Sequence, residues 1–315
     1  MFKSVILVCF GFLLLIKGAD FLVDGASSIA KKFHIPEIII GLTIVSIGTS
    51  MPELFISITS ALDGYSDMAL GNVIGSNISN LLLILGISAI LKSIEFKKET
   101  KLIEIPMCLC ITIIFLFICN KGNNITRIEA SALIVLFVLF IIYTIIRTLN
   151  ANKVGNNEES DQKNDSKGIW NSIFYIILGI IGLKIGGDIT VDNAVVIAKY
   201  FNLSEKVISL TILAIGTSLP ELVTSVTSAI KGKSDIAIGN ILGSNIFNML
   251  LIIGVSAFIK PIIYSVSYNK DLYVLIISTI VLAIFTAIPP KNKMTRTNGI
   301  VYFSMYVIYI ASLFY

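Results

Sequence analysis

The chain has 315 residues, of which 55% are hydrophobic and 14% are charged, and its formal net charge is +4. Soluble domains of this size carry roughly 25% charged residues, so the composition excludes an ordinary soluble domain. The apolar runs that recur along the whole chain indicate a polytopic membrane protein. We therefore expect it to lie in a lipid bilayer and to have no nucleic-acid partner.

Ten apolar segments predict ten transmembrane helices. In chain order they cover residues 4–28, 37–62, 68–92, 102–119, 127–149, 169–198, 205–230, 236–259, 271–289 and 298–315. The first segment resembles a secretory signal, but its pattern over residues 18–33 returns at 186–201. A removable leader has no such partner later in the chain. The sequence thus predicts an all-α polytopic membrane protein.

An internal repeat divides the chain into two halves. Residues 42–92 align with residues 210–260 without a gap, and more than half of the aligned positions are identical. Each half contains five predicted helices, so the two copies must insert in opposite orientations, as in many secondary transporters. We predict a first five-helix repeat at 1–149, a polar linker at 150–168 and a second, inverted five-helix repeat at 169–315.

The basic residues predict the orientation in the membrane. The loop "ALDGYSD" at 61–67 carries no basic residue, whereas its copy "AIKGKSD" at 229–235 carries Lys231 and Lys233. Basic residues concentrate in cytoplasmic loops. The first loop is therefore expected outside the cell and its copy inside. This orientation puts the linker in the cytoplasm and both termini outside, in a protein of the plasma membrane.

Each half also places a carboxylate beside a proline within an apolar span. The motif reads "IGTSMPELFIS" at 47–57 and "IGTSLPELVTS" at 215–225. A carboxylate there costs roughly 2.5 kcal/mol or more, so it needs a partner or a pathway. Pro52 and Pro220 each free a backbone carbonyl four residues earlier, and a freed carbonyl in a membrane must find something to bind. The oxygen-bearing residues directly around the two prolines are Thr49, Ser50, Glu53, Thr217, Ser218 and Glu221.

The span after each motif adds a stripe of amides and hydroxyls. Asn72, Ser76 and Asn80 are spaced four residues apart and are expected on one helix face. Their copies are Asn240, Ser244 and Asn248. By the same spacing, Thr49 and Glu53 would share one face of a continuous helix. The alternative to an ion site is that these residues only form hydrogen bonds between helices.

An oxygen-only set of ligands favours hard cations. Carbonyls, hydroxyls, amides and carboxylates suit Ca²⁺, and Na⁺ by the same logic, whereas Zn²⁺ or Cu⁺ would require His or Cys. The two glutamates, Glu53 and Glu221, carry a charge of about −2 when ionised, which one Ca²⁺ or two Na⁺ would neutralise. The pattern therefore predicts that unlike cations exchange at one site.

These residues resemble the signature repeats of the cation/Ca²⁺ exchanger superfamily, specifically its prokaryotic Na⁺/Ca²⁺ antiporter branch. The resemblance is carried by residues 48–80 and 216–248 and extends over essentially the whole chain. It implies ten helices in two inverted halves, with helices two, three, seven and eight around the ions and helices one and six sliding across them. It also implies antiport of Na⁺ against Ca²⁺ by alternating access, electrogenic at three Na⁺ per Ca²⁺.

The resemblance also assigns ion ligands residue by residue. The calcium site would use Glu53 and Glu221 with the backbone carbonyls of Thr49 and Thr217. Flanking sodium sites would use four hydroxyls and two further carbonyls, and two amides would line the centre. These residues are Ser50, Ser76, Ser218 and Ser244, the carbonyls of Ser46 and Ala214, and the amides of Asn80 and Asn248.

Other functions stay open on the sequence alone. Ca²⁺/H⁺ exchange and K⁺-dependent Na⁺/Ca²⁺ exchange are the alternatives within transport, although Asn248 is neutral where K⁺-dependent relatives carry an acid. An enzyme is not expected, because the chain has one histidine, no paired nucleophile motif and no phosphate-binding loop that would indicate ATP use. A channel fits inverted repeats less well. We expect Ca²⁺ and Na⁺ as substrates and no cofactor, and the sequence leaves the oligomeric state undetermined.

Overall fold

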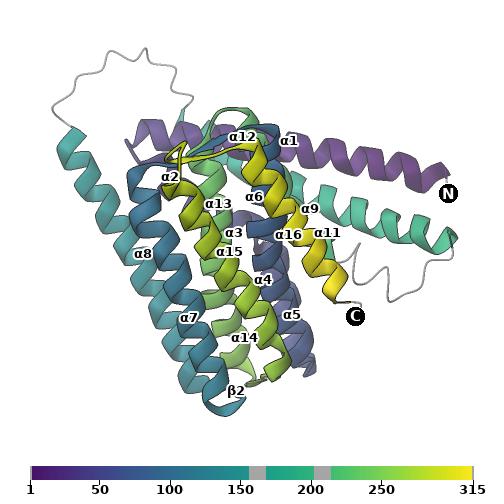
Figure 1. Ribbon diagram of the computed structural model, residues 1–315. Coiled ribbons are helices and arrows are strands. Elements are labelled where there is room, and N and C mark those ends of the chain that lie inside the picture. The colour runs from purple at the N-terminus through teal and green to yellow at the C-terminus, as the bar shows by residue number, and fades with distance from the viewer. Residues whose placement is uncertain (1, 156–167, 202–213, 314–315) are drawn as a thin grey trace.

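The computed structural model describes residues 2–155, 168–201 and 214–313, which are almost entirely helical (Figure 1). The first half contains α1 (Phe2–Lys32), α2 (Glu37–Ile40), η1 (Gly41–Val45), α3 (Ser46–Thr49), α4 (Met51–Asp63), α5 (Ser66–Ile78), η2 (Ser79–Ile84), α6 (Leu85–Leu91), η3 (Thr100–Glu104), α7 (Ile105–Gly122) and α8 (Arg127–Gly155). The second half contains α9 (Ile169–Tyr200), α11 (Ala214–Gly216), α12 (Leu219–Ile230), α13 (Ser234–Phe247), η5 (Asn248–Ile252), α14 (Ile253–Ile259), η6 (Val266–Tyr268), α15 (Asn269–Ala287) and α16 (Arg296–Ser312). The η segments are π-helical turns, except for the 3-10 turn η6.

The helices are those of a multi-pass membrane protein. Seven of the described helices are long and apolar enough to cross a membrane, and the bent pair of residues 37–49 and 51–63 makes eight if it is one span. The predicted span at 205–230 begins outside the described residues, and α12 forms its end. α16 covers most of the predicted last span and is 17 residues long.

The predicted linker at 150–168 lies mostly outside the described residues. α8 continues to Gly155, beyond the predicted boundary at residue 149. The first helix is likewise longer than predicted and reaches Lys32. Boundaries of apolar segments are poorly determined by composition, because a helix does not end where hydrophobicity ends but where its backbone is capped or broken.

Two spans form the buried centre of the bundle: α5 continued by η2 and α6, and α13 continued by η5 and α14. In each span, 83% of the most apolar stretch is buried, against 28% in α1. Small residues allow close packing there. A side chain at Gly239 would lie 2.6 Å from the carbonyl oxygen of Ile38 and 2.8 Å from the Cα atom of Gly41. The backbones of α2 and η1 therefore pack directly against α13.

α1 and α9 lie side by side, oblique to the remaining helices (Figure 1). Their backbones touch at glycines: a Cβ atom at Gly18 would lie 2.9 Å from the carbonyl oxygen of Gly179, and one at Gly11 would lie 2.9 Å from that of Gly186. The order of these contacts makes the pair antiparallel. Large apolar side chains such as Leu13 stay exposed, as expected for helices that face lipid.

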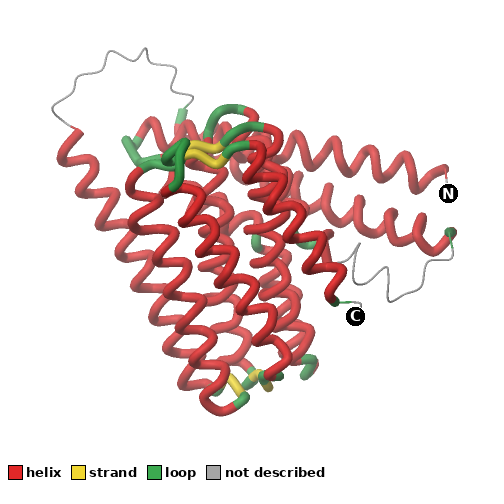
Figure 2. Tube along the Cα trace, in the orientation of Figure 1, coloured by secondary structure: helices red, strands yellow, loops and turns green. Residues whose placement is uncertain are grey.

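Four two-residue strands join the two halves at opposite ends of the bundle (Figure 2). They are β1 (Ile94–Glu95), β2 (Asn124–Ile125), β3 (Ile262–Ile263) and β4 (Lys293–Met294). β1 pairs antiparallel with β4, and β2 pairs antiparallel with β3. Ile94 lies opposite Met294, and Ile125 lies opposite Ile262, with all four side chains buried. Each pair thus links a loop of the first half to a loop of the second.

Candidate ion-binding site

Two helix breaks position the glutamates. α3 ends at Thr49 and α4 begins at Met51, with a bend of 51° between the flanking segments. Ser50 in the break has φ −85° and ψ 10°, and Ser218 has φ −88° and ψ 7° directly before α12. A proline occupies the first turn of each new helix, where its missing N–H needs no partner. The repeated motif therefore makes the same break twice.

The break differs from the expectation that Thr49 and Glu53 share a helix face. Thr49 belongs to α3 and Glu53 to α4, because the proline ring prevents one continuous helix. The Thr49 hydroxyl instead lies 3.1 Å from Asn240 Oδ1 and 3.3 Å from the carbonyl oxygen of Ser46. Thr49 therefore contacts α13, in the other half of the chain.

Both glutamates are buried, with 1% of each exposed, and hydroxyl groups connect them. Ser50 Oγ donates to Glu221 Oε1 at 2.7 Å, so one motif binds the carboxylate of the other. Ser76 Oγ donates to Glu53 Oε1 at 3.5 Å, and Ser218 Oγ lies 3.4 Å from Ser76 Oγ. The site thus places two buried carboxyl groups within one cluster of hydroxyls.

One asparagine in each half ties the broken helix to the span that follows it. Asn72 Nδ2 donates to the carbonyl oxygen of Glu53 at 3.2 Å and to Ser57 Oγ at 2.9 Å. Asn240 Nδ2 makes the equivalent bond to the carbonyl oxygen of Glu221 at 3.5 Å. These bonds hold α4 on α5 and α12 on α13 at the level of the glutamates.

Four more asparagine contacts form the centre between α5 and α13. Asn77 Nδ2 donates to the carbonyl oxygen of Asn245 at 3.1 Å, and Asn245 Nδ2 donates to that of Asn77 at 3.3 Å. Asn80 Nδ2 donates to Asn245 Oδ1, and Asn248 Nδ2 donates to Asn77 Oδ1, both at 2.9 Å. The π-helical turns η2 and η5 begin at this level, and such turns are frequent at functional sites.

Several buried oxygens at the site have no hydrogen-bond partner among the described residues. They are Glu53 Oε2, Glu221 Oε2, Asn80 Oδ1, Asn248 Oδ1 and Ser244 Oγ. A buried acceptor without a partner is costly. Carboxylate and amide oxygens only accept hydrogen bonds, so they cannot satisfy each other. A hard cation can satisfy several of them at once.

The remaining predicted ligands surround this cluster. The carbonyl oxygen of Ser46 accepts a hydrogen bond from the Ser50 amide at 3.0 Å. Thr217 is only half-buried and lines a cavity. Ala214 begins α11. Within the described ranges, no group of three or more His, Cys, Asp or Glu residues is placed to hold a metal ion. The donors around the two carboxylates are therefore mainly neutral oxygens.

A cavity of about 670 Å³ reaches this site from the end that holds the α4–α5 loop. Ser76, Thr217 and Pro220, from the two glutamate motifs and the span after the first, are among its lining residues. Its acidic lining residues are Asp67, Asp188, Asp192 and Asp271. Acidic walls attract cations and raise their local concentration. The cavity is therefore a route by which a hydrated cation can approach the glutamates.

At the opposite end, lysines of the α12–α13 loop bind α1. Lys231 Nζ lies 3.0 Å from Asp20 Oδ1 and 2.9 Å from Asp24 Oδ1. Lys233 Nζ lies 3.6 Å from Asp24 Oδ1. These groups are partly exposed, so water screens the pairs. They nevertheless fix α1 to the loop that leads into α13.

Lys97, shortly after β1, makes a further contact at this end. Its Nζ atom lies 2.6 Å from Asp235 Oδ2. The hydrogen bond to Asp235 raises the pKa of Lys97 above its ordinary value. The start of α13 is therefore held from two sides.

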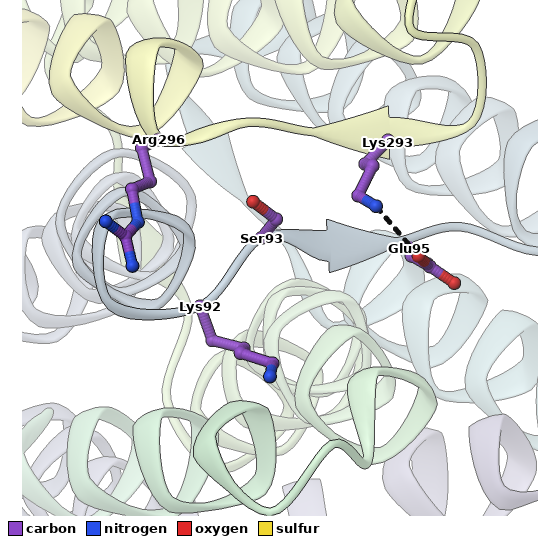
Figure 3. A pocket seen from close by; sticks show the side chains of 5 residues that line it. All are labelled: Lys92, Ser93, Glu95, Lys293 and Arg296. Carbon is purple, nitrogen blue, oxygen red and sulfur yellow. Dashed lines mark hydrogen bonds and ion pairs between the residues drawn. The ribbon is translucent and has the colours of Figure 1, made fainter.

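A basic surface pocket lies beside β1 and β4 at the same end (Figure 3). Lys92, Lys293 and Arg296 line it together with Ser93 and Glu95. Lys293 Nζ is bound to Glu95 Oε1 at 3.0 Å. The pocket adds positive charge to this end of the bundle.

The sequence analysis missed Asn77 and Asn245. Both are buried and make the central amide contacts, yet they lie off the four-residue stripe that drew attention to Asn72 and Asn80. A signal was available: each half reads "GSN" at this point, in "GSNISN" and "GSNIFN". An amide that is repeated at a position without solvent needs a specific partner.

Comparisons with known proteins agree along the whole chain. The family model described as sodium/calcium exchanger protein matches residues 3–146 and 171–315. The CaxA protein of Alkalimonas amylolytica is 37% identical over 100% of this chain and 99% of its own length. The sodium/calcium exchanger MaX1 of Methanosarcina acetivorans is 31% identical over 98% of both chains.

A solved structure has the same fold. The sodium-calcium exchanger NCX_Mj, soaked with 2.5 mM Na⁺ and 0.1 mM Ca²⁺, superposes with a TM-score of 0.85 at 31% identity. The match covers 99% of this chain and 98% of that one. The chain therefore belongs to the prokaryotic branch of the sodium/calcium exchanger protein family, which is a family of membrane transporters and not of enzymes.

Proposed function

We propose that the protein is a secondary active antiporter that exchanges Na⁺ for Ca²⁺ across the plasma membrane by alternating access, and that the exchange is electrogenic. The observation that carries this proposal is the pair of buried glutamates, Glu53 and Glu221, whose Oε2 atoms have no hydrogen-bond partner among the described residues. A site of this charge is stable when loaded and costly when empty, which couples the movement of one cation to that of another.

The proposed ligands are those of the cluster described above. Glu53 and Glu221 with the carbonyls of Thr49 and Thr217 would bind Ca²⁺. The proposed Na⁺ ligands are Ser50, Ser76, Ser218 and Ser244 with the carbonyls of Ser46 and Ala214, and Asn80 and Asn248 would line the centre. Since Asn248 is neutral, the site offers no third carboxylate for an additional K⁺.

We also infer a ten-helix architecture in two inverted repeats, at 1–149 and 169–315, joined by a cytoplasmic linker at 150–168. The strand pairs support this arrangement. The repeat offset of 168 residues, which separates Asn77 from Asn245, carries β1 onto β3 and brings β2 next to β4. The β1–β4 pair of one end thus corresponds to the β3–β2 pair of the other, and these two pairs lie at opposite ends of the bundle (Figure 2).

The charge distribution supports an orientation. Lys231, Lys233, Lys97 and the basic pocket beside β1 all lie at one end, and basic residues favour the cytoplasmic side. In this orientation the acidic cavity opens to the outside. Both termini would then be extracellular.

The test is a flux experiment with the purified full chain in liposomes. Vesicles loaded with Na⁺ are diluted into Na⁺-free buffer that contains radioactive Ca²⁺, and Ca²⁺ uptake is followed. We expect uptake that a Na⁺ ionophore abolishes and a protonophore does not. Uptake should also respond to an imposed membrane potential, because three Na⁺ carry more charge than one Ca²⁺.

The same vesicles separate the alternatives. Uptake driven by a pH gradient without Na⁺ would identify Ca²⁺/H⁺ exchange, and a requirement for K⁺ would identify K⁺-dependent exchange. Ca²⁺ entry that ignores every gradient except that of Ca²⁺ itself would contradict antiport altogether. Liposomes without protein report the passive leak.

A further inference from the structure

The central asparagines make hydrogen bonds with a consistent polarity. Asn77 and Asn245 are each bonded to the backbone of the other and also accept from one further amide. Asn245 Oδ1 accepts from Asn80, and Asn77 Oδ1 accepts from Asn248, both at 2.9 Å. All four side chains are at most 1% exposed. The four residues form an amide clamp between the α5–η2 span and the α13–η5 span, and its two halves are related by the sequence repeat.

This polarity determines which atom of Asn80 and of Asn248 faces the site. An amide carries a donor and an acceptor on one planar group, and a half-turn exchanges them. The clamp uses the Nδ2 atoms of both residues, so their Oδ1 atoms point elsewhere. Both Oδ1 atoms are buried without a partner among the described residues, as are the Oε2 atoms of Glu53 and Glu221. Two amide oxygens and two carboxylate oxygens are thus buried and left without a hydrogen-bond donor among the described residues.

We propose that Asn77 and Asn245 are positioning residues, which hold the amides of Asn248 and Asn80 with their oxygens toward the transported cation. This inference rests on the proposed function, because it assigns the orientation of two of its ligands. Neither residue would touch the cation. Each would act through one partner: Asn77 through Asn248, and Asn245 through Asn80.

Loss of the clamp would allow the Asn248 amide to turn, so that it repels the cation instead of attracting it. Without an acceptor at residue 77, nothing in the clamp holds Asn248 Nδ2, and the amide can turn about its last side-chain bond. The NH₂ group, which repels a cation, then competes for the position of the oxygen. We expect the Ca²⁺ concentration for half-maximal effect to rise about tenfold, which is the order of one hydrogen bond lost at a ligand.

The experiment is a double-mutant cycle on the purified full chain. Asn77→Leu is compared with the wild type, and the same change is made in an Asn248→Ala background. Two quantities are measured: the melting temperature without Ca²⁺, and the Ca²⁺ concentration that gives half of the maximal thermal stabilisation. Asn120→Leu is the matched control, because Asn120 and Asn269 exchange two amide bonds of 2.9 Å at an exposed position.

We expect Asn77→Leu to raise the half-maximal Ca²⁺ concentration about tenfold in the wild type and to have no further effect once Asn248 is alanine. Asn120→Leu should leave it unchanged. A drop in melting temperature without any change in Ca²⁺ dependence would mean that the clamp is only structural, and this would overturn the inference.

An equal effect of Asn77→Leu with and without Asn248 would also overturn it. If this variant does not fold, Asn245→Leu in the wild type and in an Asn80→Ala background tests the repeat-related half of the clamp. The melting measurement needs no Na⁺ gradient, so it is independent of the flux assay. A wild type that binds Ca²⁺ but shows no Na⁺-driven flux would refute the proposed function alone. A wild type that Ca²⁺ does not stabilise would refute both.

Discussion

The two ends of the proposed transport route are built from the same repeat, but their acidic residues have different partners. At one end, Asp20 and Asp24 of α1 are bound to Lys231 and Lys233. At the other end, the equivalent acids of α9, Asp188 and Asp192, line a cavity of about 670 Å³. Asp188 pairs with Lys184 of its own helix, and no ion pair joins Asp192 to a described basic residue.

The difference shows which residues make the two ends of a nearly symmetric chain unequal. The acids are repeated, and so are the helices that carry them. The lysines are not, because positions 231 and 233 correspond to Asp63 and Tyr65 in the first half. An ionic contact between this loop and the neighbouring long helix is therefore made at one end only among the described residues. The non-repeated loop residues, and not the proposed ion ligands, distinguish the two ends.

The largest expected effect is at the centre, which both ends share. Glu53→Gln and Glu221→Gln should each lower Na⁺-driven Ca²⁺ flux by roughly a hundredfold or more, because each removes a charged ligand from a buried site. The measurement is initial Ca²⁺ uptake into liposomes, with Glu95→Gln on the surface strand β1 as a control. If only one of the two replacements were harmful, the asymmetry would extend into the ion site itself.

Transfer of the lysines to the other end should have the next largest effect. In Asp63→Lys with Tyr65→Lys, the new side chains are expected to bind Asp188 and Asp192 as Lys231 and Lys233 bind their counterparts. The cavity end would then be held closed, and the Ca²⁺ concentration for half-maximal uptake from that side should rise about tenfold. Glutamines at the same two positions are the control, and an equal rise with glutamines would rule out ion pairing as the cause.

Removal of the lysines should have a smaller effect in the opposite sense. Lys231→Gln with Lys233→Gln removes the ion pairs that hold α1. Since partly exposed ion pairs contribute at most about 1 kcal/mol each, the ratio between the state open at the lysine end and the state open at the cavity end should change by about three- to fivefold. Half-maximal Ca²⁺ concentrations are measured separately from each side of oriented vesicles. Access from the lysine end should improve and access from the cavity end should worsen. Lys31→Gln with Lys32→Gln, at exposed positions that end α1, should do neither.

The smallest effect is expected at Lys97. Because its folded-state pKa is raised by Asp235, the contact stabilises the protein fully below the unfolded pKa of about 10.4 and is lost as pH rises through the folded-state value. Lys97→Gln should therefore lower the melting temperature by a few degrees at most. The difference from the wild type should stay constant between pH 6 and 9, taken as rough bounds, and should shrink only above about pH 10.4. A difference that changes near neutral pH would exclude this ion pair as its source.

Much of the framework could be predicted from single residues. Pro52 and Pro220 predicted interrupted helices beside the glutamates, and the breaks at Ser50 and Ser218 follow. The four-residue spacing of Asn72, Ser76 and Asn80 drew attention to Ser76, whose hydroxyl lies 3.5 Å from Glu53 Oε1. Composition was sufficient for the membrane class.

Contacts between the halves could not be predicted, because they depend on how two helices cross. Thr49 was expected beside Glu53 but contacts Asn240, 191 residues away. Asn77 gave no periodic signal, since its role depends on the backbone of Asn245 and not on its own helix. The difference between the two ends was likewise hidden, because a repeat predicts equal ends and only packing decides which acids meet lysines.

The strand pairs have an evolutionary consequence. β1 finds its partner in β4 and β2 finds its partner in β3, so neither half of the chain can complete an end of the bundle by itself. If the two halves descend from one ancestral unit, two copies of it would have met the same need as an antiparallel, two-fold symmetric dimer, each donating a strand to the other. Fusion of their genes would then have made the partnership permanent and freed each loop to acquire its own charges.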